Sequence, residues 1–74
     1  MKPEDIRENQ IVYWWWKSGI CRGIVMAIAD NRAVIHHIQR VEMGMLRPVP
    51  EAPSVMFLPP EDLHPMAHEV QPPT

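Results

Sequence analysis

The hydrophobic positions near the start of the chain fall into three segments that favour β-strands. Residues 11–16 are six consecutive β-branched or aromatic residues, followed by a Lys-Ser-Gly turn. In residues 20–30, bulky aliphatic side chains alternate with small ones, and this period of two is typical of a strand. Asp30-Asn31-Arg32 offers a hairpin turn, and residues 33–41 are the third predicted strand. Strands joined by so short a turn are antiparallel.

The second of these segments has one bulky face and one small face. Because the small face leaves room, we expect another backbone or a bulky neighbour to lie close to it, with a bend or bulge at Gly23. The bulky face comprises Ile20, Ile24, Met26 and Ile28, and the small face comprises Cys21, Gly23, Val25, Ala27 and Ala29.

Prolines bracket the remaining elements. Pro48, Pro50 and Pro53 favour an extended loop over residues 42–53, which either covers the core or contacts a ligand. Residues 54–58 are a short apolar strand. Pro60 opens a single helical turn, and residues 64–66 are predicted to form a closing edge strand.

These elements define one domain over residues 11–66. Residues 1–10 are an N-terminal segment with a short helical turn that begins at Pro3. Residues 67–74 show no hydrophobic periodicity of a helix or a strand and are expected to be a flexible C-terminal tail.

Five short strands, a hairpin between the second and third, and a helical turn before the last strand resemble the SH3-like small barrels, including Tudor-type modules. The resemblance covers residues 10–66 and implies a mainly β fold, a small five-stranded antiparallel barrel. Two groups of residues in this chain are Lys17-Ser18-Gly19 with Gly23-Ile24-Val25, and Ser54-Val55 with Leu63. They are similar to segments of the plasmid-encoded type II dihydrofolate reductases, which are tetrameric barrels of this size. Where that family's pore has Val-Gln-Ile-Tyr, this chain has Val-Met-Phe-Leu at 55–58. The amide and phenol that contact folate and nicotinamide are missing, so no catalytic residue is carried over.

Composition narrows the classes of function. With 74 residues there is no room for a separate substrate domain or a dinucleotide fold, and a net charge of -2 does not favour nonspecific phosphate binding. A single cysteine, Cys21, cannot form an internal disulfide, which suits a reducing cytoplasm. Acids at Glu4 and Asp5 and the lack of a long apolar run predict neither secretion nor membrane insertion.

The aromatic segment is the strongest candidate for a binding site. Tyr13 and Trp15 lie on one side of the predicted strand, and Trp14 and Trp16 lie on the other; the pattern does not determine which pair faces out. Since one face of most strands in so small a barrel meets solvent, we predict that at least one pair is partly exposed and anchors a partner. The adaptable thioethers of the methionines and a polar rim of arginines complete the surface. The candidate partner-binding residues are Tyr13, Trp14, Trp15, Trp16, Arg22, Arg40, Met43, Met45 and Met56.

The expected function is therefore a small non-enzymatic protein-binding module, an accessory subunit or an inhibitor of a larger protein. A proline-rich peptide, a second copy of the chain, or a methylated cation held in an aromatic cage are other occupants of the same surface. The alternatives are a nucleic-acid-binding barrel and an oligomeric reductase-like barrel with an axial site. Nucleic-acid binding is disfavoured because nine acidic residues outweigh seven basic ones.

Catalytic and metal chemistry find little support. His36 and His37 point to opposite faces of a strand, and Pro65 interrupts the helical spacing of His64 and His68, so no metal site is expected. Cys21 is adjacent to Arg22, yet no acid, oxyanion donor or nucleophile motif accompanies it. We expect a buried packing cysteine and neither catalytic residues nor a cofactor.

Overall fold

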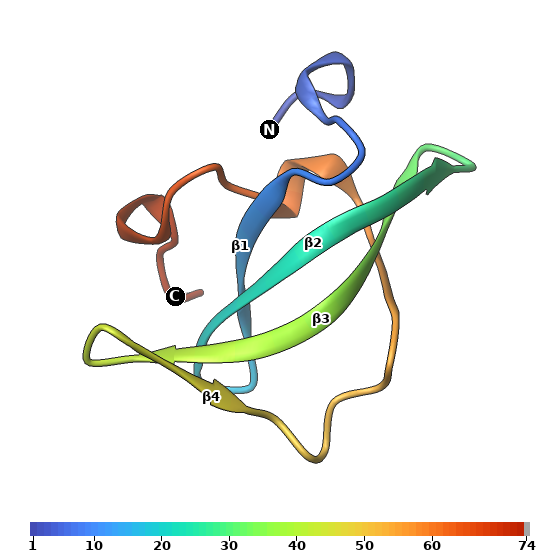
Figure 1. Cartoon of the computed structure of the whole chain (residues 1–74). Helices are drawn as coiled ribbons and strands as arrows, with labels where there is room; N and C mark the ends of the chain where they lie inside the picture. Colours follow the sequence, from blue (N-terminus) through green and yellow to red (C-terminus); the bar gives the residue numbers. More distant parts are fainter. Residues whose placement is uncertain (74) are drawn as a thin grey trace.

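Three tight hairpins connect the first four strands of the sheet (Figure 1). The computed structural model describes residues 1–73. The strands are β1 (Ile11–Trp16), β2 (Gly19–Ala29), β3 (Arg32–Glu42), β4 (Met45–Pro48) and β5 (Met56–Leu58). Their order is β1-β2-β3-β4, all neighbours are antiparallel, and β5 pairs with the other half of β3. Residues 1–73 also form three 3-10 turns: η1 (Pro3–Asp5), η2 (Pro60–Asp62) and η3 (Ala67–Glu69).

Each hairpin turn has two central residues with positive φ. They are Lys17-Ser18, Asp30-Asn31 and Met43-Gly44. Positive φ at both positions is what a two-residue turn needs to match the twist of its strands. The first two turns lie where the sequence predicts them. The third corrects the prediction for residues 42–53, because Met43-Gly44 folds the chain back onto β3 as strand β4 before the prolines begin.

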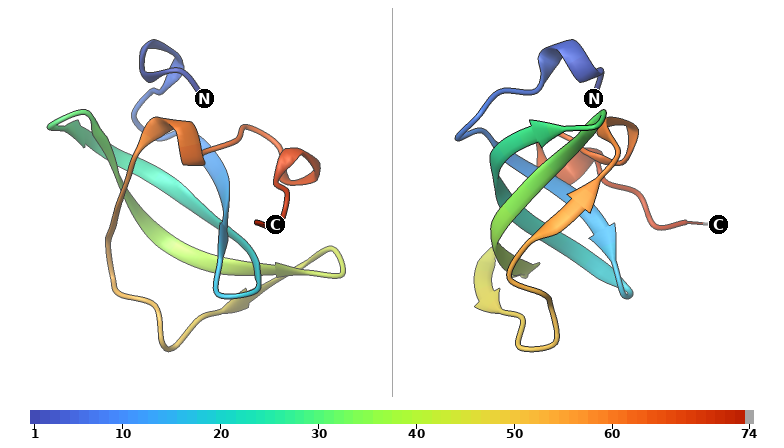
Figure 2. Two further views of the ribbon diagram at one scale, coloured as in Figure 1. Left: turned by 180° about the vertical axis from the view of Figure 1, so that it is seen from behind. Right: turned by 90° about the vertical axis from the view of Figure 1, so that its right-hand side faces the viewer.

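The fold class is confirmed as a mainly β, five-stranded antiparallel sheet, but the sheet is not closed. The predicted edge strand at 64–66 is wrong, since β4 is the fifth strand instead. At this place His64 alone bridges to Tyr13, through two backbone hydrogen bonds of 2.9 Å. Pro65 follows directly and has no N–H to extend the pairing. Figure 2 shows the segment after β5 crossing from the β3 side toward β1.

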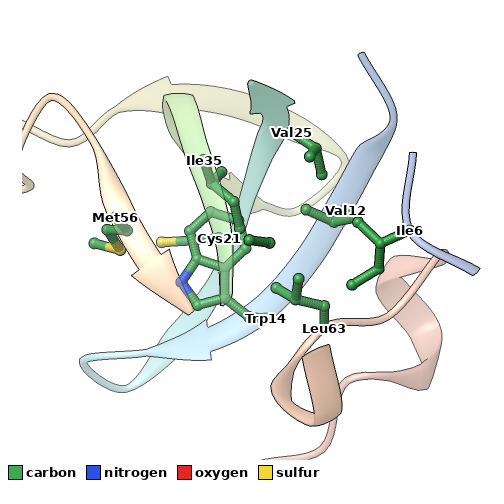
Figure 3. Packing of buried hydrophobic residues seen from close by; sticks show 9 residues of the cluster. Ile6, Val12, Trp14, Cys21, Val25, Ile35, Met56 and Leu63 are labelled. Carbon is green, nitrogen blue, oxygen red and sulfur yellow. The ribbon is translucent and has the colours of Figure 1, made fainter. Parts of the chain in front are cut away.

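The indole of Trp14 fills the centre of the core (Figure 3). It packs against Gly23 of the neighbouring strand. A Cβ atom added to Gly23 would lie 2.9 Å from Cη2 of Trp14 and closer still to Cγ2 of Ile35. The small face of β2 therefore faces inward and accepts a bulky neighbour, as predicted. The buried residues of this cluster are Ile6, Val12, Trp14, Cys21, Val25, Ala33, Ile35, Met56 and Leu63.

The predicted bulge at Gly23 is also present. The register between β2 and β3 shifts between Arg22 and Ile24, where His37 and Ile38 occupy the facing stretch of β3. His37 has a φ of 54°, a left-handed conformation that is rare for a residue other than glycine. Bulges increase the local twist, which helps the long strands β2 and β3 to curve around Trp14.

The chain beyond η2 packs back onto the sheet for part of its length. Residues Ala67–Glu69 form η3, and Val70 is buried. An apolar side chain thus anchors a segment that the sequence suggested would be a flexible tail, and Thr74 lies outside the described residues. Within residues 1–73, no helix is long and apolar enough to cross a membrane.

The packing of Trp14 on Gly23 predicts a strong asymmetry between two glycines of the same strand. We expect Gly23→Ala to lower the free energy of unfolding by about 1–3 kcal/mol, because the added methyl overpacks Trp14 and Ile35. Gly19→Ala is the matched control. Its added methyl meets the flexible end of the Arg40 side chain, so its cost is smaller. Urea unfolding monitored by tryptophan fluorescence measures both values, and equal costs at the two positions would contradict this description of the core.

Candidate binding face

The structure determines which aromatic pair faces outward. Trp14 is 1% exposed, and Trp16, which is half-buried, packs against the core from the same side of β1. Tyr13 and Trp15 lie on the opposite, outer side and are half-buried. Trp14 is therefore removed from the candidate contact residues, since a side chain this deeply buried has no surface to offer a partner.

An apolar row crosses the outer face of four strands. Trp15 of β1 pairs with Ile20 of β2, Ile20 pairs with Val41 of β3, and Val41 pairs with Leu46 of β4. Directly paired residues present their side chains on the same face. Leu46 is 46% exposed, and the other three are half-buried. The outer face thus holds a continuous apolar strip, which we call the Trp15 row.

Two hollows flank Trp15. The first, here the tail hollow, measures about 300 Å³ and is lined by Trp15, by the polar residues Glu61, Asp62 and His64, and by Val70, Gln71 and Pro73 of the C-terminal segment. The second, here the hairpin hollow, measures about 570 Å³ and is lined by Trp15 and Ile20, with charged groups at its margin. The charged residues of the hairpin hollow are Lys17, Arg40 and Glu42. A partner that covers Trp15 therefore meets carboxylates on one side and mainly cations on the other.

The backbone of Trp15 also lies at an open sheet edge. Tyr13 exchanges two hydrogen bonds with His64 on the side of β1 that faces away from β2. Along an antiparallel strand, residues two apart direct their N–H and C=O groups to the same side, so those of Trp15 point to this edge as well. No backbone hydrogen bond joins Trp15 to another loop or turn in the described part of the chain. Within residues 1–73 this N–H and C=O thus have no backbone partner, and the C-terminal residues Val70, Gln71 and Pro73 lie beside the same indole.

Methionine makes the tip of the β3–β4 hairpin unusually apolar. Met43 is 100% exposed with a φ of 49°, and Met45 is 56% exposed. Both lie beside Leu46 at the end of the Trp15 row. Met56, by contrast, is 7% exposed and belongs to the core, so it is removed from the candidate residues.

The two candidate arginines serve different purposes. Nη1 of Arg40 donates to the carbonyl oxygen of Trp16 at 2.7 Å, and Nη2 donates to that of Lys17 at 3.4 Å. Arg40 thus holds the β1–β2 turn, and its guanidinium carbon lies 5.9 Å from the centre of a Trp16 ring. Arg22 instead lies on the outer face, where Nη1 donates to Oε1 of Gln39 at 3.2 Å.

Sequence reasoning did not single out three members of the Trp15 row: Ile20, Val41 and Leu46. The place of Leu46 in the row depends on β4, which was not predicted, whereas Ile20 and Val41 join the row through the pairing of the three predicted strands β1, β2 and β3. The available signal was Met43-Gly44, a glycine-containing pair between two strand-like segments, which is the pattern of a hairpin turn.

Cys21 has the environment of a packing residue. It is fully buried, and burial raises the pKa of its thiol, an effect that Arg40 opposes and Glu51 reinforces. Among residues 1–73 no three histidine, cysteine or acidic side chains come together as a metal site would require. Comparison with protein families, curated proteins and solved structures found no match to this chain.

The raised pKa of Cys21 gives a prediction for its reactivity. We expect an alkylating reagent in mildly alkaline buffer to modify Cys21 far more slowly in the folded protein than in denaturant, because the buried thiol stays protonated. Stability should also fall as pH rises through the ordinary thiol pKa, since only the unfolded chain ionises there, and Cys21→Ala should lack that loss. Mass spectrometry follows the labelling; equal rates in both states would refute a buried thiol.

Proposed function

We propose that the chain is a non-enzymatic protein-binding module, an accessory subunit or inhibitor of a larger protein, whose contact surface is centred on Trp15. The observation that carries the proposal is the position of Trp15 at an open sheet edge between two charged hollows. Large, rigid aromatic side chains that are surrounded by polar groups are the usual anchors of protein interfaces.

The proposed partner presents an extended segment to β1. Its backbone pairs with the free N–H and C=O of Trp15, as in the addition of a strand to a sheet edge. Its apolar side chains cover the Trp15 row, and the thioethers of Met43 and Met45 adjust to their shape. A basic side chain of the partner fits the tail hollow, because Glu61 and Asp62 lie there beside the indole, where a cation is also attracted to the ring.

The fold of this module is proposed to be an SH3-like barrel with an incompletely closed sheet. Support comes from the order of its elements: a 3-10 turn, η2, lies between β5 and the residue that bridges to β1. The curved strands β2 and β3, each with bulged pairing, bend the sheet in the way that a small barrel requires.

A nucleic acid is the less favoured partner. Lys17 and Arg22 supply positive charge near the outer face, but Glu61 and Asp62 lie directly beside Trp15. A base stacked on this indole would bring its phosphates close to two carboxylates, which weakens binding. The reductase-like alternative has less support, because Met56 stands at the position of that family's amide and lies in the core.

Photocrosslinking tests the proposed surface without a known partner. The tagged chain carries p-benzoylphenylalanine in place of Leu46, at the end of the Trp15 row, and is irradiated in a lysate of the cells in which the protein occurs. We expect discrete crosslinked proteins, and we expect excess untagged wild-type chain to suppress them. A product that contains only this chain would identify the partner as a second copy.

Competition with variants decides whether Trp15 is the anchor. In the crosslinking experiment, untagged Trp15→Ser chain should suppress the crosslinked products at least about tenfold less well than untagged wild-type chain. An interface anchor contributes about 2 kcal/mol or more to binding. Ile28→Ser is the matched control, because Ile28 is 50% exposed but lies outside the Trp15 row, and it should compete fully. Circular dichroism checks that both variants are folded. The proposal fails if Trp15→Ser competes as well as the wild type or if only a nucleic acid is crosslinked.

A further inference from the structure

A third hollow, larger than those beside Trp15, lies between strands β2 and β3 and the proline-rich loop that leads to β5. We call it the loop hollow. It measures about 700 Å³, within the range of about 300–1,000 Å³ that is usual for small-molecule sites. None of its lining residues lines either hollow beside Trp15, so it is a separate feature of the surface.

The loop hollow offers several hydrogen-bond donors, and Arg22 is the residue with the most of them. Arg22 uses one N–H on Oε1 of Gln39, at 3.2 Å, and its guanidinium carries five in total. Because the Gln39 oxygen accepts this bond, its amide nitrogen has N–H groups to offer. The hydroxyl of Ser54 and the imidazole of His37 also line the space. No aspartate or glutamate of the described residues does so. The hollow is thus electrostatically matched to an anion.

Its apolar walls are held by rigid backbone. Pro48, Pro50 and Pro53 form one side, and the fixed φ of proline limits the conformations of the loop. Ala52 fastens the loop in two ways: it packs against the core, and its N–H donates to the carbonyl oxygen of Val49 at 3.0 Å. A site with this little freedom loses little entropy when a ligand binds.

Backbone strain is present at the same place. His37 adopts its left-handed φ of 54° at the bulge opposite Gly23, and its side chain lines the loop hollow. Strained residues of this kind are found preferentially at functional sites. The strain is independent of the hollow's charge and volume, and it points to the same part of the surface.

We propose that the loop hollow binds a small organic carboxylate with an aromatic or aliphatic body, and that Arg22 is its anchor. The planar guanidinium matches a carboxylate through two parallel hydrogen bonds, and the Gln39 amide supplies a further donor. Ile24 and Val49 contact the apolar body of the ligand. No residue of the Trp15 row lines the loop hollow, so this proposal does not rest on the proposed partner of Trp15.

Nuclear magnetic resonance titration of the ¹⁵N-labelled protein tests the charge requirement. Phenylacetate is compared with its neutral analogue phenylacetamide, with phenyl phosphate, and with acetate. We expect phenylacetate to shift the side-chain signals of Arg22 and Gln39 and to bind at least about tenfold more tightly than phenylacetamide, as a charge-assisted hydrogen bond requires. Tighter binding of phenyl phosphate than of phenylacetate would replace the carboxylate with a phosphate as the ligand class. Equal binding of the acid and the amide, or no shifts with any probe, would overturn the proposal.

Substitution of Arg22 tests the anchor. Arg22→Gln should weaken phenylacetate binding at least about tenfold, and Arg22→Lys should restore only part of it, because lysine keeps the charge but loses the paired donors. Arg32→Gln is the control, since Arg32 is exposed and lies outside all three hollows; it should bind as the wild type does. Unchanged binding in Arg22→Gln would overturn the assignment of Arg22. If that variant does not fold, the comparison of phenylacetate with phenylacetamide on the wild type decides the question.

Discussion

The contact of Trp14 with Gly23 controls the orientation of the sheet. Side chains alternate along a strand, so placing Trp14 in the core leaves Trp15 on the outer face. The antiparallel register then carries this choice to Ile20, Val41 and Leu46, which fall on the same side as Trp15. The candidate binding face therefore follows from a packing event on the opposite side of β1.

This contact is held by shape and not by hydrogen bonding. Nε1 of Trp14 is buried, and no acceptor within residues 1–73 receives its N–H. An unsatisfied buried donor costs about 1–3 kcal/mol, so the burial of the large indole must offset this cost. This burial is possible because Gly23 leaves the space that the ring needs. Strand β2 therefore has to place a residue without a side chain opposite Trp14 of β1.

Local features of the sequence were sufficient to predict most strands and turns of the sheet. The alternation in residues 20–30, the Asp30-Asn31 turn and the proline at η2 act over short distances, and the structure has a strand, a hairpin and a 3-10 turn at these places. Two features escaped prediction because they depend on distant residues. Strand β4 forms only because β3 offers it an edge, and its few residues precede a run of prolines that suggested a loop. The side on which Trp15 lies was undetermined on β1 alone, although the small face of β2 held the information.

The short strand β4 also affects whether further copies of the chain can add to this edge of the sheet. Exposed sheet edges are templates on which further copies of a chain add strand by strand into fibrous aggregates. Here the outer edge of β4 is short, carries the charge of Arg47 and ends at Pro48, which has no N–H to donate. Growth of an extended sheet by stacking of copies is thus blocked at this edge, even though Met43, Met45 and Leu46 are exposed nearby. Pro48 therefore limits the addition of a further strand beside some of the most exposed apolar side chains of the protein.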